Sequence, residues 1–228
     1  MAAMKPLMKL AETTGPDGSS WELWERDGVF SLLHDGVACS SGMSHGSEEA
    51  MAEWGVAPVV RANQPCFLFA GLGLGYGLAA AMRAMPREKA RFIVAEPCEA
   101  IVEWNRTFAR DVHPGLWDDP RVVVEAQSAV ELARKRTGSL HAVFLQSAHA
   151  RCELSPQDAN AYFGALKGGG LLMIALARSD KRLEAMLRRA GFEVTSQAVP
   201  ASHKGKATRM HTIVLARRGR FVPFARKS

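Results

Sequence analysis

Short segments of alternating polar and apolar residues open the chain, and Asp-Gly pairs separate them. Strands are expected at 21–25, 29–33 and 37–39. The pairs Asp27-Gly28 and Asp35-Gly36 fit two-residue hairpin turns, which favour residues that tolerate a positive φ. The pattern therefore predicts a small N-terminal β-meander, and residues 1–20 are expected to be a loose leader before it.

A short helix is expected over residues 47–54, directly after the meander. Ser47 can cap its first turn, and the two glutamates that follow favour the positive end of the helix dipole. The meander and this helix together form a predicted small unit over residues 21–55.

From residue 66 onward the pattern changes to strands that alternate with helices. The strands are expected at 67–70, 91–95, 121–125, 142–145, 171–177, 192–198 and 211–216, and the helices at 77–85, 98–110, 129–136, 156–166 and 180–190. Five strand–helix units that end in a strand pair predict an α/β fold, with a seven-stranded, mostly parallel sheet and one antiparallel strand near its edge. Ser155 and Ser179 are expected to cap two of the helices, and residues 168–170, all glycine, to form a turn.

A glycine-rich segment between the first strand of this pattern and its helix carries the candidate chemistry. It runs Gly71-Leu-Gly73-Leu-Gly75-Tyr-Gly77, and Glu96 follows at the end of the next strand. Glycines let the backbone approach a bound nucleotide, and an acidic residue at the second strand tip can accept hydrogen bonds from two ribose hydroxyls. The spacing predicts a nucleoside-binding site formed by Gly71, Gly73, Gly75 and Glu96, without identifying the nucleoside.

Composition and charge argue against a membrane protein and against a nucleic-acid partner. The chain has 228 residues, 47% of them apolar, and no apolar run approaches the roughly 18 to 20 residues that span a bilayer, so a membrane protein is not expected. The net charge is +6, with a basic tail over 219–228 that either is solvated or attracts an anionic partner. Nucleic acid is not an expected partner, because no aromatic residues interleave with the basic ones. Residues 56–218 are left as the main domain.

The cysteines indicate the compartment. They are Cys39, Cys66, Cys98 and Cys152, and no two of them form a CxxC pair. Scattered cysteines argue against a zinc site or a disulfide framework and favour a cytoplasmic protein. The histidines are dispersed and no acid-rich cluster accompanies them, so no metal is expected.

The seven-strand plan, the glycine segment and Glu96 resemble the Rossmann-like class I S-adenosylmethionine-dependent methyltransferase fold. The N-terminal meander, the helix start at 44–50 and the segments 94–105, 119–124 and 209–217 look like the spermidine synthase-like group of that superfamily. The resemblance implies S-adenosylmethionine or its decarboxylated form as the donor, and association as a homodimer. Spermidine synthases use the decarboxylated form to donate an aminopropyl group.

Two segments depart from the usual pattern of that group. Where the group has Gly-Asp-Ala at the adenine, this chain has Ala-Gln-Ser-Ala, so Gln127 or Ser128 is expected to hydrogen-bond the base. Where the group has an Asp-rich segment that takes a proton from the attacking amine, residues 145–151 contain no carboxylate. Alkyl amines are mostly protonated near pH 7 and attack only as the free base, so a polyamine acceptor is disfavoured.

These departures favour transfer of a methyl group to a small-molecule acceptor that the sequence does not identify. Methyl transfer depends mainly on alignment, and a weakly protonated acceptor does not require a carboxylate. His149 is the candidate base near neutral pH, with Gln146 and Ser147 orienting the acceptor. Two alternatives stay open: a non-catalytic nucleoside-binding or scaffold protein, and an aminopropyltransferase.

His45 and Tyr76 are further candidates for the acceptor pocket. His45 lies at the junction between the meander and the main domain, and Tyr76 lies in the glycine segment. Each has a structural alternative, local hydrogen bonding for His45 and packing on the neighbouring helix for Tyr76. Trp21 and Trp24 point to opposite faces of one strand, so one of them is expected to be half exposed and to favour a subunit contact.

Overall fold

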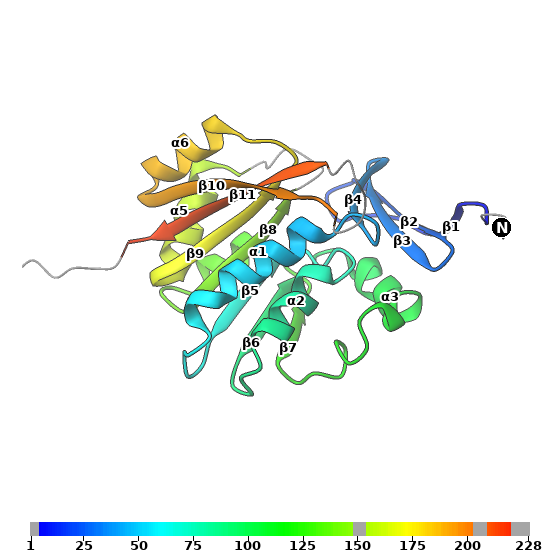
Figure 1. The fold of residues 1–228 in the computed structure, drawn as a ribbon, viewed down its shortest axis with the longest axis horizontal. Helices are drawn as coiled ribbons and strands as arrows, with labels where there is room; N and C mark the ends of the chain where they lie inside the picture. The colour runs from blue at the N-terminus through cyan, green and yellow to red at the C-terminus, as the bar shows by residue number, and fades with distance from the viewer. Residues whose placement is uncertain (1–4, 148–153, 203–208, 220–228) are drawn as a thin grey trace, which may run out of the picture.

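The computed structural model describes residues 5–147, 154–202 and 209–219, which form a small sheet and a large sheet (Figure 1). The small sheet is antiparallel, in the order β1 (Met8–Thr14), β2 (Ser20–Arg26), β3 (Val29–His34) and β4 (Val37–Ser41). The three predicted strands of the meander are present, and the two Asp-Gly pairs adopt the positive φ expected of their turns. A fourth strand, β1, precedes them.

Strand β1 lies inside the stretch that was expected to be a loose leader, so that expectation is wrong for residues 8–14. The residues of this strand are either exposed or half-buried, and its register with β2 shifts between Lys9 and Ala11. It is fixed by backbone pairing, from Met8 opposite Glu25 to Thr14 opposite Ser20. A strand that is held by pairing with a later strand need not show alternating apolar residues, so the sequence pattern did not predict it.

The aromatic residues of β2 are both half-buried and engaged within the small sheet. Trp21 stacks on His34 with ring centroids 4.2 Å apart, and the Trp24 indole N–H donates to a Glu22 carboxylate oxygen at 2.7 Å. The association of this protein as a homodimer stays a prediction.

The large sheet has the predicted seven strands. They are β5 (Cys66–Ala70), β6 (Arg91–Ala95), β7 (Val122–Glu125), β8 (Leu140–Ser147), β9 (Leu166–Leu176), β10 (Phe192–Pro200) and β11 (Met210–Arg218). Their order is β10-β11-β9-β8-β5-β6-β7, and among these described strands β11 pairs antiparallel with β10 and β9, whereas the other pairs are parallel. This confirms the predicted α/β fold. The three glycines at 168–170 lie within β9, not in a turn, where the register with β8 shifts between Leu140 and Ala142.

The described helices are α1 (Gly46–Val56), α2 (Tyr76–Ala84), α3 (Glu99–Thr107), α4 (Ala129–Arg134), α5 (Pro156–Ala165) and α6 (Lys181–Arg189), with short 3-10 turns at Ala57–Val59 and Arg110–Val112. Ser155 caps α5 as expected. Helix α6 is capped by Asp180 rather than by Ser179, because the Asp180 carboxylate accepts from the N–H groups of Arg182 and Leu183.

Ser47 does not cap α1. Its buried hydroxyl lies 2.8 Å from Nδ1 of the buried His211 on β11, and His45 occupies the cap position without a side-chain capping hydrogen bond. The hydroxyl therefore ties α1 to the large sheet. The predicted small unit ended at residue 55, but in the structure α1 lies against the large sheet beside α2 (Figure 1).

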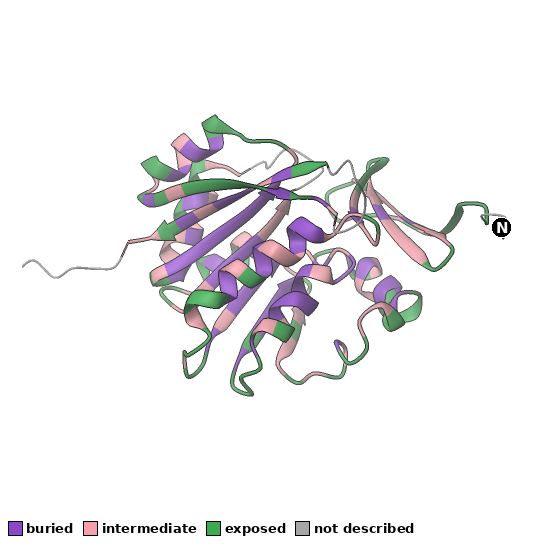
Figure 2. Cartoon of the chain, viewed as in Figure 1, coloured by how far each residue is buried: buried purple, intermediate pink, exposed green. Residues whose placement is uncertain are grey.

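The strands separate two apolar layers, because successive side chains of a strand point to opposite faces. Phe67 and Phe69 of β5 pack with α1, α2 and α3, whereas Leu68 packs with α4, α5 and α6. The strands in the middle of the sheet are buried along most of their length, and the outer faces of the helices are exposed (Figure 2). Among the described residues, no helix combines the length and apolar character needed to cross a membrane.

Helix α1 approaches the sheet closely at Gly55. A Cβ added there would lie 2.7 Å from Cζ of Phe144 and 3.2 Å from Cγ of Met173. Both neighbours are buried core residues, so they have little room to move.

We therefore expect Gly55→Ala to lower the free energy of unfolding by about 1–3 kcal/mol, in spite of the better helix propensity of alanine. Thermal and denaturant unfolding would measure the change. Gly164→Ala is the matched control, because Gly164 is also helical and has open space around it. This control should leave stability unchanged or raise it by up to about 1 kcal/mol. Equal effects of the two substitutions would contradict the close approach of α1.

Candidate functional site

The glycine loop crosses the carboxyl edge of the large sheet between β5 and α2. Gly71, Gly73 and Gly75 have φ angles of +86°, +57° and +80°, a region that other residues rarely adopt. The Gly71 N–H donates to the Ala95 carbonyl at 2.9 Å, which holds the loop over the end of β6. This is the edge at which open α/β sheets bind their ligands.

Glu96 lies directly below this loop and is 5% exposed. One carboxylate oxygen accepts from the Leu72 N–H at 3.0 Å, and the other accepts from the Cys98 N–H at 3.0 Å. Burial raises the pKa of Glu96, and the two backbone donors oppose that rise. A carboxylate has about four acceptor positions, so each oxygen can still accept from a ligand hydroxyl.

Two cavities lie beside Glu96. One, of about 280 Å³, is lined mainly by apolar residues that include Ala70, Pro97, Leu145 and Tyr162, together with Gly71 and Ser128. The other, of about 490 Å³, is lined by Glu96 itself, Val124, Ala126 and residues of α3. The carboxyl edge therefore offers space for a flat apolar group and for a polar group on either side of the strand tip.

Ser128 and Gln127, the two residues expected to contact the nucleobase, differ in their position relative to these cavities. Ser128 lines the smaller cavity, and its hydroxyl also caps α4 by accepting from the Glu131 N–H at 3.3 Å. Gln127 lines neither cavity, because its amide is held between Glu125 at 3.4 Å and Lys135 at 2.6 Å. The structure thus brings Ser128 to the candidate site and turns Gln127 away from it.

Gln146 lies on the other side of the glycine loop, at the end of β8. A Cβ added to Gly77 would lie 2.7 Å from its Nε2, and a Cβ added to Gly73 would lie 3.3 Å from its Oε1. The side chain therefore fills the space that these two glycines leave. Its Nε2 donates to the Glu48 carboxylate at 3.3 Å.

Glu48 is the site residue that sequence reasoning missed. It lies in the first turn of α1 and is 1% exposed, and its second oxygen accepts from the Ser40 hydroxyl at 3.3 Å. The same hydroxyl accepts from the Leu74 N–H of the glycine loop at 3.2 Å. Glu48, Ser40 and Gln146 therefore form one polar cluster behind the loop, in which Glu48 and Ser40 are buried. It contains a carboxyl group, which residues 145–151 do not.

The surroundings of Glu48 disfavour its charge. Burial raises its pKa to about 8, and the hydrogen bonds from Ser40 and Gln146 only partly offset this effect. Near neutral pH the carboxyl group is mostly protonated while no cation is near it.

Asn105 also supports the loop and was not predicted as a site residue. It is buried on α3 and donates through Nδ2 to the Gly73 carbonyl at 2.9 Å and to the Ile101 carbonyl at 2.8 Å. An amide on the buried face of a helix was the only sequence signal for this role.

His45 and Tyr76 are brought together, as one stacked pair with ring centroids 4.1 Å apart. His113 packs edge-on against Tyr76 at 4.8 Å, and burial lowers the pKa of His113 to about 4. Glu49 contacts His45 Nδ1 at 3.3 Å. Neither His45 nor Tyr76 lines the two cavities beside Glu96, so their part in an acceptor pocket stays a prediction.

The remaining predicted residues follow β8. Ser147 is the last residue of that strand. His149, the candidate base, lies outside the described residues, as does Cys152.

Cys39, Cys66 and Cys98 are free thiols. Within the described ranges, no group of three or more His, Cys, Asp or Glu side chains is placed to hold a metal ion.

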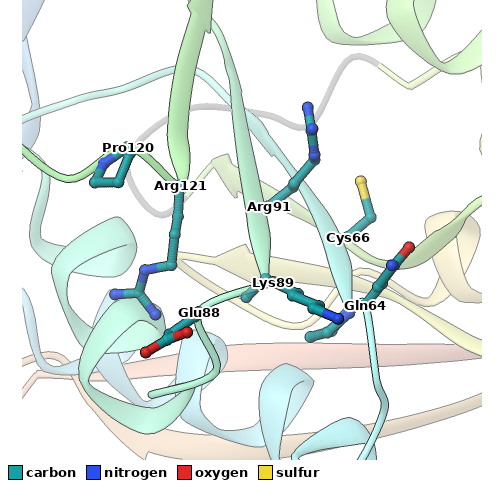
Figure 3. Close-up of a pocket in the computed structure, with 9 residues that line it drawn as sticks. Gln64, Cys66, Glu88, Lys89, Arg91, Pro120 and Arg121 are labelled. Carbon is teal, nitrogen blue, oxygen red and sulfur yellow. The ribbon is translucent and has the colours of Figure 1, made fainter.

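Another cavity, of about 520 Å³, lies at the opposite edge of the sheet, around the start of β5 and β6 (Figure 3). Its lining includes the basic residues Lys89, Arg91 and Arg121 and the acidic Glu88. The Arg121 guanidinium is already occupied by Asp119 at 2.7 Å and by the Met85 carbonyl at 2.6 Å. Because ligands of such sheets bind at the carboxyl ends of the strands, this cavity is not the candidate site.

The structure is similar to several solved proteins of known type, whereas neither the protein-family models nor the curated proteins include a match to the sequence. A spermidine synthase in complex with the transition state analogue AdoDATO is 16% identical, with a TM-score of 0.71, over 92% of this chain and 72% of that one. The spermidine synthase from Thermotoga maritima is also 16% identical, with a TM-score of 0.70 over the same shares.

The structure is also similar to a methyltransferase. The 1,6-didemethyltoxoflavin-N1-methyltransferase from Burkholderia thailandensis, with bound S-adenosylhomocysteine, is 19% identical over 75% of this chain and 79% of that one, with a TM-score of 0.52. At these identities the likeness shows the fold, which is the Rossmann-like methyltransferase fold that the sequence predicted.

Glu48 makes stability depend on pH in an unusual direction. Its pKa is raised from 4.5 to about 8 on folding, so folding favours the protonated acid. The stability of the folded protein is therefore highest below pH 4.5 as far as this group is concerned, and it falls as the pH rises toward 8. Across that window each pH unit costs about 1.4 kcal/mol. Glu48→Gln keeps the shape and removes the titration. We expect the variant to match the parent protein near pH 4 and to exceed its stability by several kcal/mol near pH 8, as measured by denaturant unfolding at each pH. Parallel pH profiles of the two proteins would contradict the raised pKa.

Proposed function

We propose that this protein is an S-adenosylmethionine-dependent transferase that moves a methyl group to a small-molecule acceptor. The observation that carries the proposal is the buried Glu96 carboxylate, 3.0 Å from the Leu72 N–H of a left-handed glycine loop at the carboxyl edge of the sheet. Carboxylates in this position accept hydrogen bonds from ribose hydroxyls, and the loop lets a ligand approach the backbone.

The described residues fit such a donor. Glu96 has acceptor positions left for a ribose, and the apolar cavity formed with Pro97, Leu145 and Tyr162 suits a flat base. Ser128 adds one hydroxyl at the rim of that cavity. The bound donor would supply an electrophilic methyl group on a sulfonium, so the chain has mainly to position the acceptor and exclude water.

The acceptor side of the site lies around Gln146. Its amide is held by the hydrogen bond to Glu48 and occupies the space beside Gly73 and Gly77. It can therefore orient a methyl-accepting substrate by a hydrogen bond at the end of β8. Ser147 and His149 follow directly in the chain, and His149 is the proposed base for an acceptor that has to lose a proton.

Aminopropyl transfer is the second candidate, and one observation favours it. The likeness to the spermidine synthase with AdoDATO spans 92% of this chain, whereas the likeness to the toxoflavin-type methyltransferase spans 75%. The first span is long enough to include most of the small N-terminal sheet. Decarboxylated S-adenosylmethionine would then be the preferred donor.

Calorimetric titration with S-adenosylmethionine, its decarboxylated form and methylthioadenosine tests these proposals. We expect S-adenosylmethionine to bind more tightly than the decarboxylated form. We expect Glu96→Ala to weaken binding by about 10- to 100-fold, the loss typical of hydrogen bonds to a charged group. Glu193→Gln, an exposed carboxylate on β10, is the matched control and should bind like the parent protein.

Each other outcome has a definite meaning. Preference for the decarboxylated form would replace methyl transfer by aminopropyl transfer. Binding of methylthioadenosine alone would favour a non-catalytic nucleoside-binding protein. If none of the three ligands binds to a protein that is folded by thermal melting, the transferase proposal is wrong.

A further inference from the structure

A buried carboxyl group lies behind the glycine loop. Glu48 is 1% exposed, and its two oxygens lie 3.3 Å from the hydroxyl of Ser40 and 3.3 Å from the amide nitrogen of Gln146, respectively. A glutamine would fill the same volume without the cost of burying an ionisable group. An ionisable group placed so deeply beside a candidate ligand site is typical of functional sites.

The Glu48 cluster is one contact away from the loop that faces the proposed donor. Ser40 touches Glu48 on one side and accepts from the Leu74 N–H on the other. Gln146 touches Glu48 with Nε2, and its Oε1 lies 3.3 Å from the Cβ position of Gly73. A charge bound against this loop is therefore close to Glu48, with little water between them to screen the interaction.

We propose that Glu48 is the counter-ion of the transferase site, and that it loses its proton when a sulfonium cation binds against the glycine loop. This inference rests on the proposed function, because it takes the cationic donor from there. The O–H bond of the Glu48 carboxyl group breaks, the proton passes to the solvent, and the remaining carboxylate balances the positive charge of the ligand. No covalent bond to the ligand forms or breaks in this step.

The other titratable groups near Glu48 do not compensate a new positive charge in the same way. They are Glu49 on α1, His45 directly before α1, Tyr76 and Arg83 on α2, Cys39 on β4, His211 on β11 and His113. Glu49 already pairs with Arg83 at 3.1 Å and with His45 at 3.3 Å. Burial raises the pKa of Cys39 to about 12 and raises that of Tyr76, so both stay neutral near pH 7.

An ionised Glu48 would make the site prefer a cationic ligand to a neutral one of the same shape. The sulfonium donor carries a positive charge on sulfur that the thioether product lacks, whereas the amino-acid parts of the two molecules are the same. An ionised Glu48 favours the donor, and its return to the neutral acid removes this advantage once the charge is gone. The counter-ion would therefore favour donor binding and product release at the same site.

Proton release on binding tests the proposal directly. The ligands are S-adenosylmethionine and S-adenosylhomocysteine, each titrated near pH 7 in two buffers whose ionisation enthalpies differ, so that the heat reports the protons exchanged. The difference between the ligands isolates the charge on sulfur. We expect the parent protein to release between about half a proton and one proton more with S-adenosylmethionine.

Two variants locate the proton. Glu48→Gln should abolish the difference between the ligands while leaving a folded protein. Glu49→Gln, which changes the adjacent carboxylate, should retain that difference and is the matched control. Equal proton release with both ligands in the parent protein, or a difference that survives in Glu48→Gln, would overturn the role of Glu48 and leave the proposed function intact. Failure of both ligands to bind would instead overturn the proposed function, and this inference with it.

Discussion

The close approach of α1 to the large sheet is the constraint on which the site depends. Gly55 lets the end of the helix pack against Phe144 and Met173, and Ser47 ties its beginning to His211 on β11. Fixed at both ends, the helix has one register against the sheet, and that register places Glu48 opposite the end of β8. The cluster of Glu48, Ser40 and Gln146 is therefore a consequence of core packing rather than of a loop that folds around a ligand.

The same packing explains the glycines of the loop. The strand-to-helix connection has to pass over Glu96 while Ser40 and Gln146 occupy the space on its other side. A Cβ at Gly77 would collide with the Gln146 amide, and one at Gly73 would crowd both Ser40 and Gln146. These two glycines make room for side chains of the protein itself, which is a different requirement from close approach to a nucleotide.

The sequence predicted what depends on local pattern and missed what depends on pairing between distant segments. The strands of the large sheet, the glycine loop and Glu96 follow from alternation and spacing, so they were found together with the antiparallel strand β11. Strand β1 was missed because it is held by β2 rather than by an apolar face. Glu48 was assigned to the helix dipole, since nothing in its neighbourhood along the chain shows that Gln146 lies 98 positions away in the sequence and in contact with it.

The contact with Glu48 also changes the chemical interpretation of Gln146. From the sequence alone, an amide in place of the usual acidic segment left the centre without a carboxylate and argued against a polyamine acceptor. In the structure that amide stands in front of a buried carboxyl group, which lies behind the first layer of side chains. A buried carboxyl group with a raised pKa can change its charge with the ligand, which a solvated carboxylate near pH 7 cannot do. The departure from the usual acidic pattern is therefore consistent with a site that responds to positive charge, and it does not by itself indicate a lost activity.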